Sequence, residues 1–164
     1  MKDKNLVQII RFFDEEAESR YISPLEKYRI RLLKDSKTAY ATCRKRADIL
    51  LRTMDNDELN DLYIIVKTGR FSKYRSNDAA WKQAKRQYAF GDIASWRKHL
   101  GEKRVSNDAC IEYLRKFDAK IIVDSIYSYL RLYPSSIRSK ALLEQANIAR
   151  ITTRMNKSKK IETR

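Results

Sequence analysis

The chain has 164 residues, with 36 lysines and arginines against 21 aspartates and glutamates, and its formal net charge is +15. This length suits one domain that buries a sizeable core without disulfides or metal ions. Three glycines and two prolines are too few for the turns of a β-sheet protein, so we expect an all-α fold. The net charge predicts an anionic partner but says nothing about the fold.

Several classes of protein are disfavoured by the residues that the sequence lacks. Cys43 and Cys110 form no CxxC pair, and His99 is the only histidine, so cysteine and histidine cannot supply a zinc ligand set. No apolar run has the length of a membrane span, and acidic residues follow the first apolar residues too closely for a signal peptide. We therefore expect a soluble cytoplasmic protein with no cofactor, metal ion or membrane partner.

The first predicted helix lies near the N-terminus, where five apolar residues recur at helical spacing: Leu6, Ile9, Ile10, Phe13 and Ala17. The second begins at residues 23–26 (SPLE), where serine caps, proline suits the first helical position and glutamate completes a capping box. Its apolar period is carried over about eight turns by Leu25, Tyr28, Leu32, Ala39, Cys43, Leu50 and Met54. We expect this long helix to be the central element.

Residues 55–58 (DNDE) repeat the capping pattern and predict a third helix that ends at Gly69. The residues expected to face inward are Leu59, Leu62, Tyr63 and Val66. An acidic cluster at the start of this helix consists of Asp55, Asp57, Glu58 and Asp61. It lacks the loop glycine and the distal glutamate of a calcium loop, whereas a helix N-terminus attracts carboxylates, so capping is the preferred interpretation.

Residues 76–79 and 106–109 are both SNDA, which places two identical tetrapeptides 30 residues apart. Continuing this register pairs Ser95 with Ser125 and Leu100 with Leu130. Each unit predicts a cap, a helix, a short break and a second helix, giving two tandem helical hairpins at about residues 76–104 and 106–133. The alternative, that SNDA is a good cap used twice without duplication, stays open because the identities are few.

A last helix is expected after Pro134, with an apolar face formed by Ile137, Ala141, Leu142, Gln145 and residues 148–151. Residues 154–164 have no apolar period, so we expect a disordered basic tail. The predicted architecture is a single-domain helical bundle of about six to eight helices over residues 1–153. It comprises a long-helix part (1–68) and a basic helical-hairpin part (69–153).

Positive charge is concentrated after residue 60. Residues 1–60 carry 13 basic and 11 acidic side chains, whereas residues 61–105 carry 11 and 4. On a helical wheel of residues 78–89, Trp81 and Tyr88 share one stripe and three cations share another, so we expect the tryptophans in the core and the cations outside. The candidate phosphate-binding residues are Arg70, Lys73, Arg75, Lys82, Lys85, Arg86, Arg97, Lys98, Lys103 and Arg104. A supporting basic face is expected after Arg115.

These features predict a non-enzymatic protein that binds DNA or RNA through its phosphates. Phe71 and Tyr74 interrupt the cations in a segment without helical period, where they suit either base stacking or a small apolar cluster. One alternative is a helical subunit of a nucleoprotein complex that docks a protein partner through the acidic first helix. Another is a helix-turn-helix regulator, because residues 90–100 (FGDIASWRKHL) have the outline of a turn and a recognition helix.

No motif for catalysis stands out. The sequence contains no phosphate-binding glycine loop and no GxSxG nucleophile turn, and His99 is expected to cap a helix end. The carboxylates that a metal-dependent nuclease would need are Asp14, Glu15, Glu16 and Glu18. We expect them on the outer face of the first helix, where their charge repels phosphate, so an enzyme is not the preferred interpretation.

Overall fold

The computed structural model describes residues 1–20, 30–74, 78–79, 82–83, 93–132 and 140–148, and all regular secondary structure in these residues is helical. The helices are α1 (Asp3–Arg20), α2 (Ile30–Thr53), α3 (Asn56–Tyr74), α5 (Ile93–His99), α6 (Asn107–Arg115) and α7 (Ala119–Leu130). Residues 140–148 form a further helix. The predicted all-α fold is confirmed, and none of the described helices combines the length and apolar character needed to cross a bilayer.

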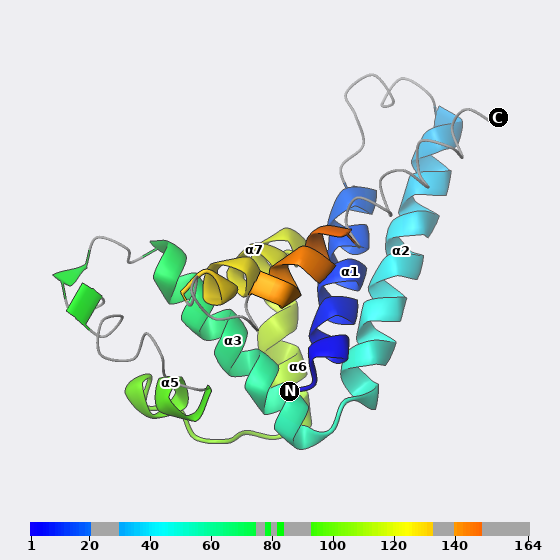
Figure 1. Ribbon diagram of the computed structural model, residues 1–164. Helices are drawn as coiled ribbons and strands as arrows, with labels where there is room; N and C mark the ends of the chain where they lie inside the picture. Colours follow the sequence, from blue (N-terminus) through cyan, green and yellow to red (C-terminus); the bar gives the residue numbers. More distant parts are fainter. Residues whose placement is uncertain (21–29, 75–77, 80–81, 84–92, 133–139, 149–164) are drawn as a thin grey trace.

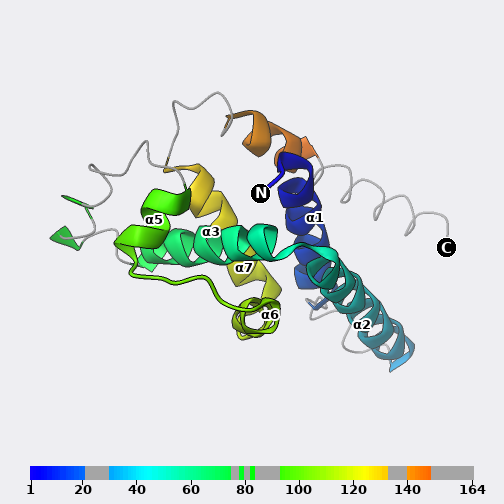
Figure 2. The same cartoon turned by 90° about the horizontal axis from the view of Figure 1, so that it is seen from below.

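Helix α7 lies between α3 and the pair formed by α1 and α2 (Figure 1). It packs against α3 on one side and α1 on the other, and α1 pairs with the antiparallel α2. Helices α5 and α6 both pack against α3, and α6 also reaches α2. Seen from below, α5 and α2 lie at opposite ends of the molecule (Figure 2).

The core is built from the apolar faces that the helical period predicts. The five predicted apolar residues of α1 are all buried, and Trp96 of α5 is completely inaccessible. Among residues 40–53 of α2, whose side chains the structure describes, Ala47 and Leu51 are buried, followed by Met54, whereas the predicted Leu50 is half-buried. Trp81, the predicted helix start at 23–26 and the predicted tail at 154–164 lie outside the described residues.

Gly69 does not end the third helix, so the predicted stop is wrong. α3 continues to Tyr74, and the segment around Phe71, which was expected to lack helical period, is therefore helical. A Cβ atom at Gly69 would overlap with the backbone carbonyl of Ser125 in α7. The missing side chain lets the two helix backbones approach closely, and this tertiary packing outweighs the low helix propensity of glycine. The predicted division at residues 68 and 69 falls inside α3.

The predicted caps at Asp55 and Ser106 are confirmed. Asp55 Oδ1 accepts a hydrogen bond from the Glu58 backbone N–H at 2.7 Å, and Ser106 Oγ accepts one from Ala109 N–H at 3.3 Å. An additional cap, Asp118, accepts from Lys120 N–H at 3.1 Å and starts α7. Helices α6 and α7 thus occupy the second predicted hairpin, whereas much of the first lies outside the described residues.

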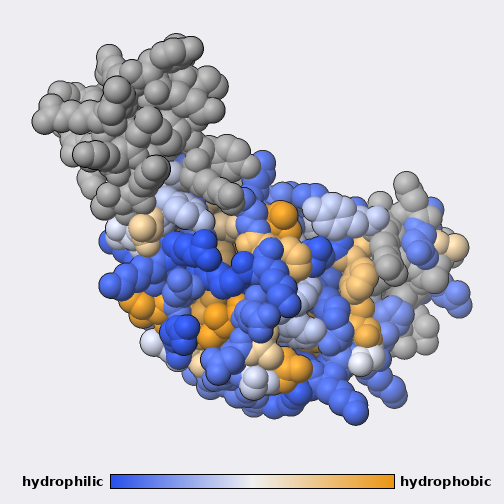
Figure 3. All heavy atoms as spheres, turned by 180° about the vertical axis from the view of Figure 1, so that it is seen from behind, coloured by the Kyte–Doolittle hydropathy of each residue, from blue (hydrophilic) through white to orange (hydrophobic). Residues whose placement is uncertain are grey.

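Of the predicted inward positions of the last helix that the structure describes, Leu142 is confirmed and the others are wrong. Leu142 and Ala146 are buried, whereas Ala141 and Gln145 are exposed and Ile148 is 64% exposed. Leu142 and Ala146 are four residues apart and therefore lie on the same face of the helix, which is the face that packs inward. On the face shown in Figure 3, hydrophilic residues surround scattered apolar ones, as in a protein with a polar exterior.

Candidate nucleic-acid interface

Arg70, a residue of α3, contacts Tyr113 of α6 and Phe117, which follows α6. Its Cζ atom lies 3.6 Å from the centroid of the Phe117 ring, and its Nη1 donates a hydrogen bond to the Tyr113 hydroxyl at 3.3 Å. Its Nε is buried and has no hydrogen-bond partner among the residues that the structure describes. A guanidinium packed on an aromatic face in this way stabilises the contact between α3 and the end of α6. Arg70 is therefore half-buried, and its contacts are with the protein's own aromatic residues.

Lys73 and Arg104 form exposed ion pairs. Lys73 Nζ lies 2.9 Å from Asp124 Oδ2, and this hydrogen bond raises the pKa of the Lys73 ammonium. Arg104 pairs with Asp57 in the first turn of α3, and both side chains are largely exposed. Such surface pairs contribute only about 0–1 kcal/mol, so a phosphate group competes with the carboxylate at little cost.

Arg97 is a structural residue of the α5–α3 contact. Its Nη2 donates to the backbone carbonyl of Asn60 at 2.9 Å, and its Nη1 lies 3.4 Å from Asn60 Oδ1. The side chain is half-buried, so this candidate phosphate contact is engaged with α3.

Lys98 and Lys103 are exposed, and neither side chain has a hydrogen bond or ion pair to any residue that the structure describes. They lie on the segment that contains α5 and the residues connecting it to α6, together with the exposed Arg104. We call Lys98, Lys103 and Arg104 the basic edge. The edge lies beside the N-terminal half of α3, because Arg97 bonds to Asn60, Glu102 to Tyr63 and Arg104 to Asp57.

The remaining candidates are less defined. Lys82 is exposed and helical, and it has no side-chain partner among the described residues. Arg75, Lys85 and Arg86 lie outside the described residues. The same holds for residues 84–92, which include the turn of the helix-turn-helix interpretation. The part of that motif described here is α5, which turns Trp96 inward and exposes Lys98.

The two aromatic residues predicted beside the cations have different environments. Phe71 packs against the core, whereas Tyr74 is 63% exposed at the C-terminal end of α3. Lys73 Nζ lies 5.8 Å from the Tyr74 ring centroid. Base stacking is therefore open to Tyr74 but not to Phe71.

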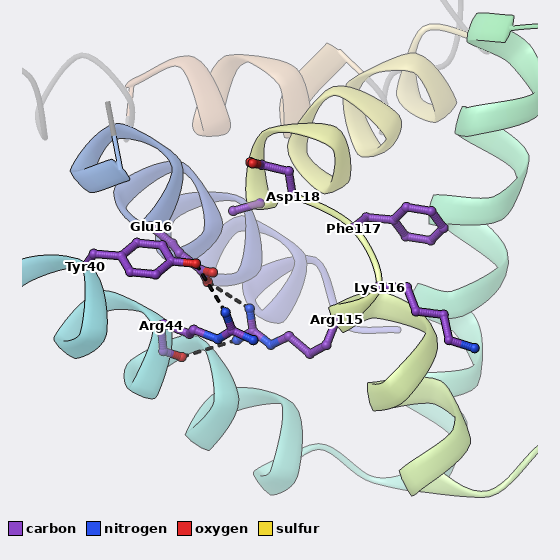
Figure 4. Close-up of a pocket in the computed structure, with 8 residues that line it drawn as sticks. Glu16, Tyr40, Arg44, Arg115, Lys116, Phe117 and Asp118 are labelled. Atoms are coloured by element: carbon purple, nitrogen blue, oxygen red, sulfur yellow. Dashed lines mark hydrogen bonds and ion pairs between the residues drawn. The ribbon is translucent and has the colours of Figure 1, made fainter. Parts of the chain in front are cut away.

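Arg115 itself is bonded inside the protein and is not part of an exposed basic face. Its Nε lies 2.6 Å from Asp48. Its Nη1 lies 2.8 Å from Glu16, and Nη2 donates to the backbone carbonyl of Arg44 (Figure 4). The side chain is 13% exposed, so this cation joins α1, α2 and α6 inside the molecule. The supporting face was expected after Arg115, where Lys116, Lys120 and Arg131 are exposed, and it stays a prediction.

The shallow pocket beside Arg115 has a volume of about 190 Å³ and is lined by α1, α2 and the connection from α6 to α7. Tyr40 and Arg44 form its α2 wall, where Arg44 Nη1 donates to the Tyr40 hydroxyl at 3.2 Å. Lys116 and Phe117 point away from it in Figure 4. Because the guanidinium of Arg115 is already bonded by protein acceptors, the pocket offers few free donors to an anion.

The acidic residues of α1 are not all on its outer face, and that expectation was wrong. Asp14 and Glu16 are buried, and Glu15 pairs with Arg11 at 3.1 Å. No group of three or more histidine, cysteine or acidic residues in the described part of the chain is arranged to hold a metal ion. The carboxylates proposed for a nuclease therefore serve contacts within the protein.

The acidic cluster at the start of α3 is also divided among separate partners. Asp55 caps the helix and Asp57 pairs with Arg104. Glu58 is buried and accepts two hydrogen bonds from the Asn5 amide, at 2.8 and 2.9 Å. These contacts agree with the structural interpretation of the cluster.

Of the candidate cations, the structure thus gathers Lys98, Lys103 and Arg104. Sequence reasoning missed Asn60, a completely buried polar residue that contacts the same segment, because nothing local in the sequence marks it. Comparison with protein-family models, with curated proteins and with solved structures found no match for this chain.

Proposed function

We propose that the protein binds nucleic acid through the phosphate backbone and that the basic edge is a principal contact surface. The observation that carries the proposal is the state of Lys98 and Lys103, which are exposed beside Arg104 and have no carboxylate partner among the described residues. A net charge of +15 favours encounter with a polyanion over long range.

The chemistry is non-enzymatic binding. Lysine ammonium groups and the arginine guanidinium attract phosphate oxygens and release the counterions condensed on the nucleic acid. Arg104 contributes by exchanging Asp57 for a phosphate, which is possible because both side chains of that pair are exposed. Phosphate contacts of this kind position the protein without reading the base sequence.

The alternative interpretation, docking of a protein neighbour through the acidic first helix, has less support. Asp14 and Glu16 are buried, and the latter is occupied by Arg115. Little of the negative charge that such a docking face requires is left on the outside of α1.

The proposal is tested by neutralising the edge. Lys98→Gln/Lys103→Gln should lower affinity for a labelled duplex by about five- to tenfold at fixed salt, because two phosphate contacts are lost. Lys45→Gln/Lys140→Gln is the matched control, since both lysines are exposed, lack described partners and lie outside the edge. Equal losses in the two variants would mean that only total charge matters, and the edge would then have no special role.

A further inference from the structure

Asn60 uses its side-chain amide to hold the connection between α5 and α6. Its Nδ2 donates to the backbone carbonyl of Val105 at 2.9 Å, and its Oδ1 accepts from the Val105 N–H at 3.0 Å. Nδ2 also donates to the carbonyl of Asn56 at 2.9 Å. The amide is completely buried and satisfied, and a buried polar group in this state fixes its partners strongly.

Neighbouring contacts tie the same segment to α3. Asn56 Nδ2 donates to Asn107 Oδ1 at 2.7 Å and to the Val105 carbonyl at 3.3 Å. Glu102 accepts from the Tyr63 hydroxyl at 2.8 Å and pairs with Lys67. Residues 102–106 have no helix of their own, so these side chains determine where the backbone runs.

The cations of the basic edge lie between these attachment points. Arg97 and Val105 are both bonded to Asn60, and Lys98, Lys103 and Arg104 fall between them in the chain. Fixing a segment before binding removes part of the conformational entropy that binding would otherwise cost. The edge is therefore pre-organised, and Asn60 is the residue that contacts both ends of it.

We propose that Asn60 is a positioning residue whose amide holds Val105 so that Lys98, Lys103 and Arg104 face the phosphates of a double-stranded nucleic acid. This inference rests on the proposed function and specifies its partner. A duplex is stiff and carries phosphates at a regular, high density, so a fixed array of cations suits it better than a flexible single strand.

The aromatic rings beside the edge support the choice of a duplex. Trp96 and Tyr63 are buried, and Tyr113 is half-buried in edge contact with the rings of Tyr63 and Phe117. Within the described residues next to the edge, no tyrosine, tryptophan or phenylalanine ring is therefore fully open to stacking, and the exposed ring there is that of His99, which lies in edge contact with Trp96. Binding of single strands depends largely on such stacking. The exposed Tyr74 lies at the opposite end of α3 from Asn60.

The experiment compares Asn60→Leu with the unaltered protein, because leucine has a similar size and the substitution leaves the net charge unchanged. Duplex affinity should fall about tenfold, whereas affinity for a single strand of the same length should change less than about twofold. The effect should shrink in the Lys98→Gln/Lys103→Gln background, since Arg104 is then the only edge cation left to be positioned. Amide hydrogen exchange should show loss of protection at Val105 with α7 still protected.

Circular dichroism at the binding temperature checks folding, and Asn56→Ala, which loosens the same segment from an exposed position, replaces Asn60→Leu if the latter is unfolded. Unchanged duplex affinity, an equal loss on single strands, or an undiminished effect in the double-lysine background would each overturn the inference. A different result would contradict the proposed function. If Lys98→Gln/Lys103→Gln, with Asn60 intact, does not change duplex affinity, the basic edge is not a contact surface.

Discussion

Arg115 donates hydrogen bonds to Asp48, Glu16 and the carbonyl of Arg44, and so connects three helices at once. Lys98, by contrast, is exposed with no described partner. Both residues count equally toward the net charge of +15. The availability of a cation for a polyanion therefore depends on the carboxylate nearest to it, and net charge alone overstates the binding surface.

Asp57 illustrates the same competition at the basic edge. It pairs with Arg104 while both side chains remain largely exposed. Asp57→Asn should release Arg104 and raise duplex affinity by about two- to threefold, which is the range expected from loss of a surface pair. The measurement is a fluorescence titration at fixed salt.

The control for this change is Asp108→Asn, which alters the net charge equally at an exposed residue of α6. The control should raise affinity less than Asp57→Asn does. An equal rise in both variants would show that Arg104 is not specifically released.

At the scale of single elements, α3 shows which features a sequence encodes locally. The cap at Asp55 and the burial of Leu59, Leu62, Tyr63 and Val66 follow from residue type and helical spacing, so they were predictable. The passage of α3 through Gly69 was not, because it depends on Ser125 of α7, which is distant in sequence. The pairing of Asn60 with Val105 was hidden for the same reason, since 45 residues separate the two.

Gly69→Ala tests the close approach of α3 and α7. Alanine is the better helix former by about 1 kcal/mol, yet its Cβ would meet the Ser125 backbone, which has little freedom to move. We expect the free energy of unfolding to fall by about 2 kcal/mol or more, measured by urea denaturation.

Ser72→Ala, at a half-buried position of the same helix, is the matched control and should change the stability by less than about 0.5 kcal/mol. A stabilised Gly69→Ala protein would mean that helix propensity governs this position and that the α3–α7 contact is loose.

At the scale of the whole molecule, some charged side chains pair with one another inside the protein, whereas others remain exposed on its surface. The buried pair Arg115–Glu16 joins helices inside the molecule, whereas the basic edge runs from α5 along the connection to α6, beside the N-terminal half of α3. Figures 1 and 2 show the course of this connection. The sequence predicted the all-α fold and an excess of positive charge after residue 60. It could not predict which cations remain outside, because each pairing is a contact between distant segments.

The most direct test of the account is the salt dependence of duplex binding. Each phosphate contact on B-form DNA contributes about 0.9 to the slope of log affinity against log salt concentration. The unaltered protein should therefore show a steep negative slope, and Lys98→Gln/Lys103→Gln should reduce its magnitude by about 2 while Lys45→Gln/Lys140→Gln leaves it nearly unchanged. A flat salt response of the unaltered protein would contradict binding through phosphates.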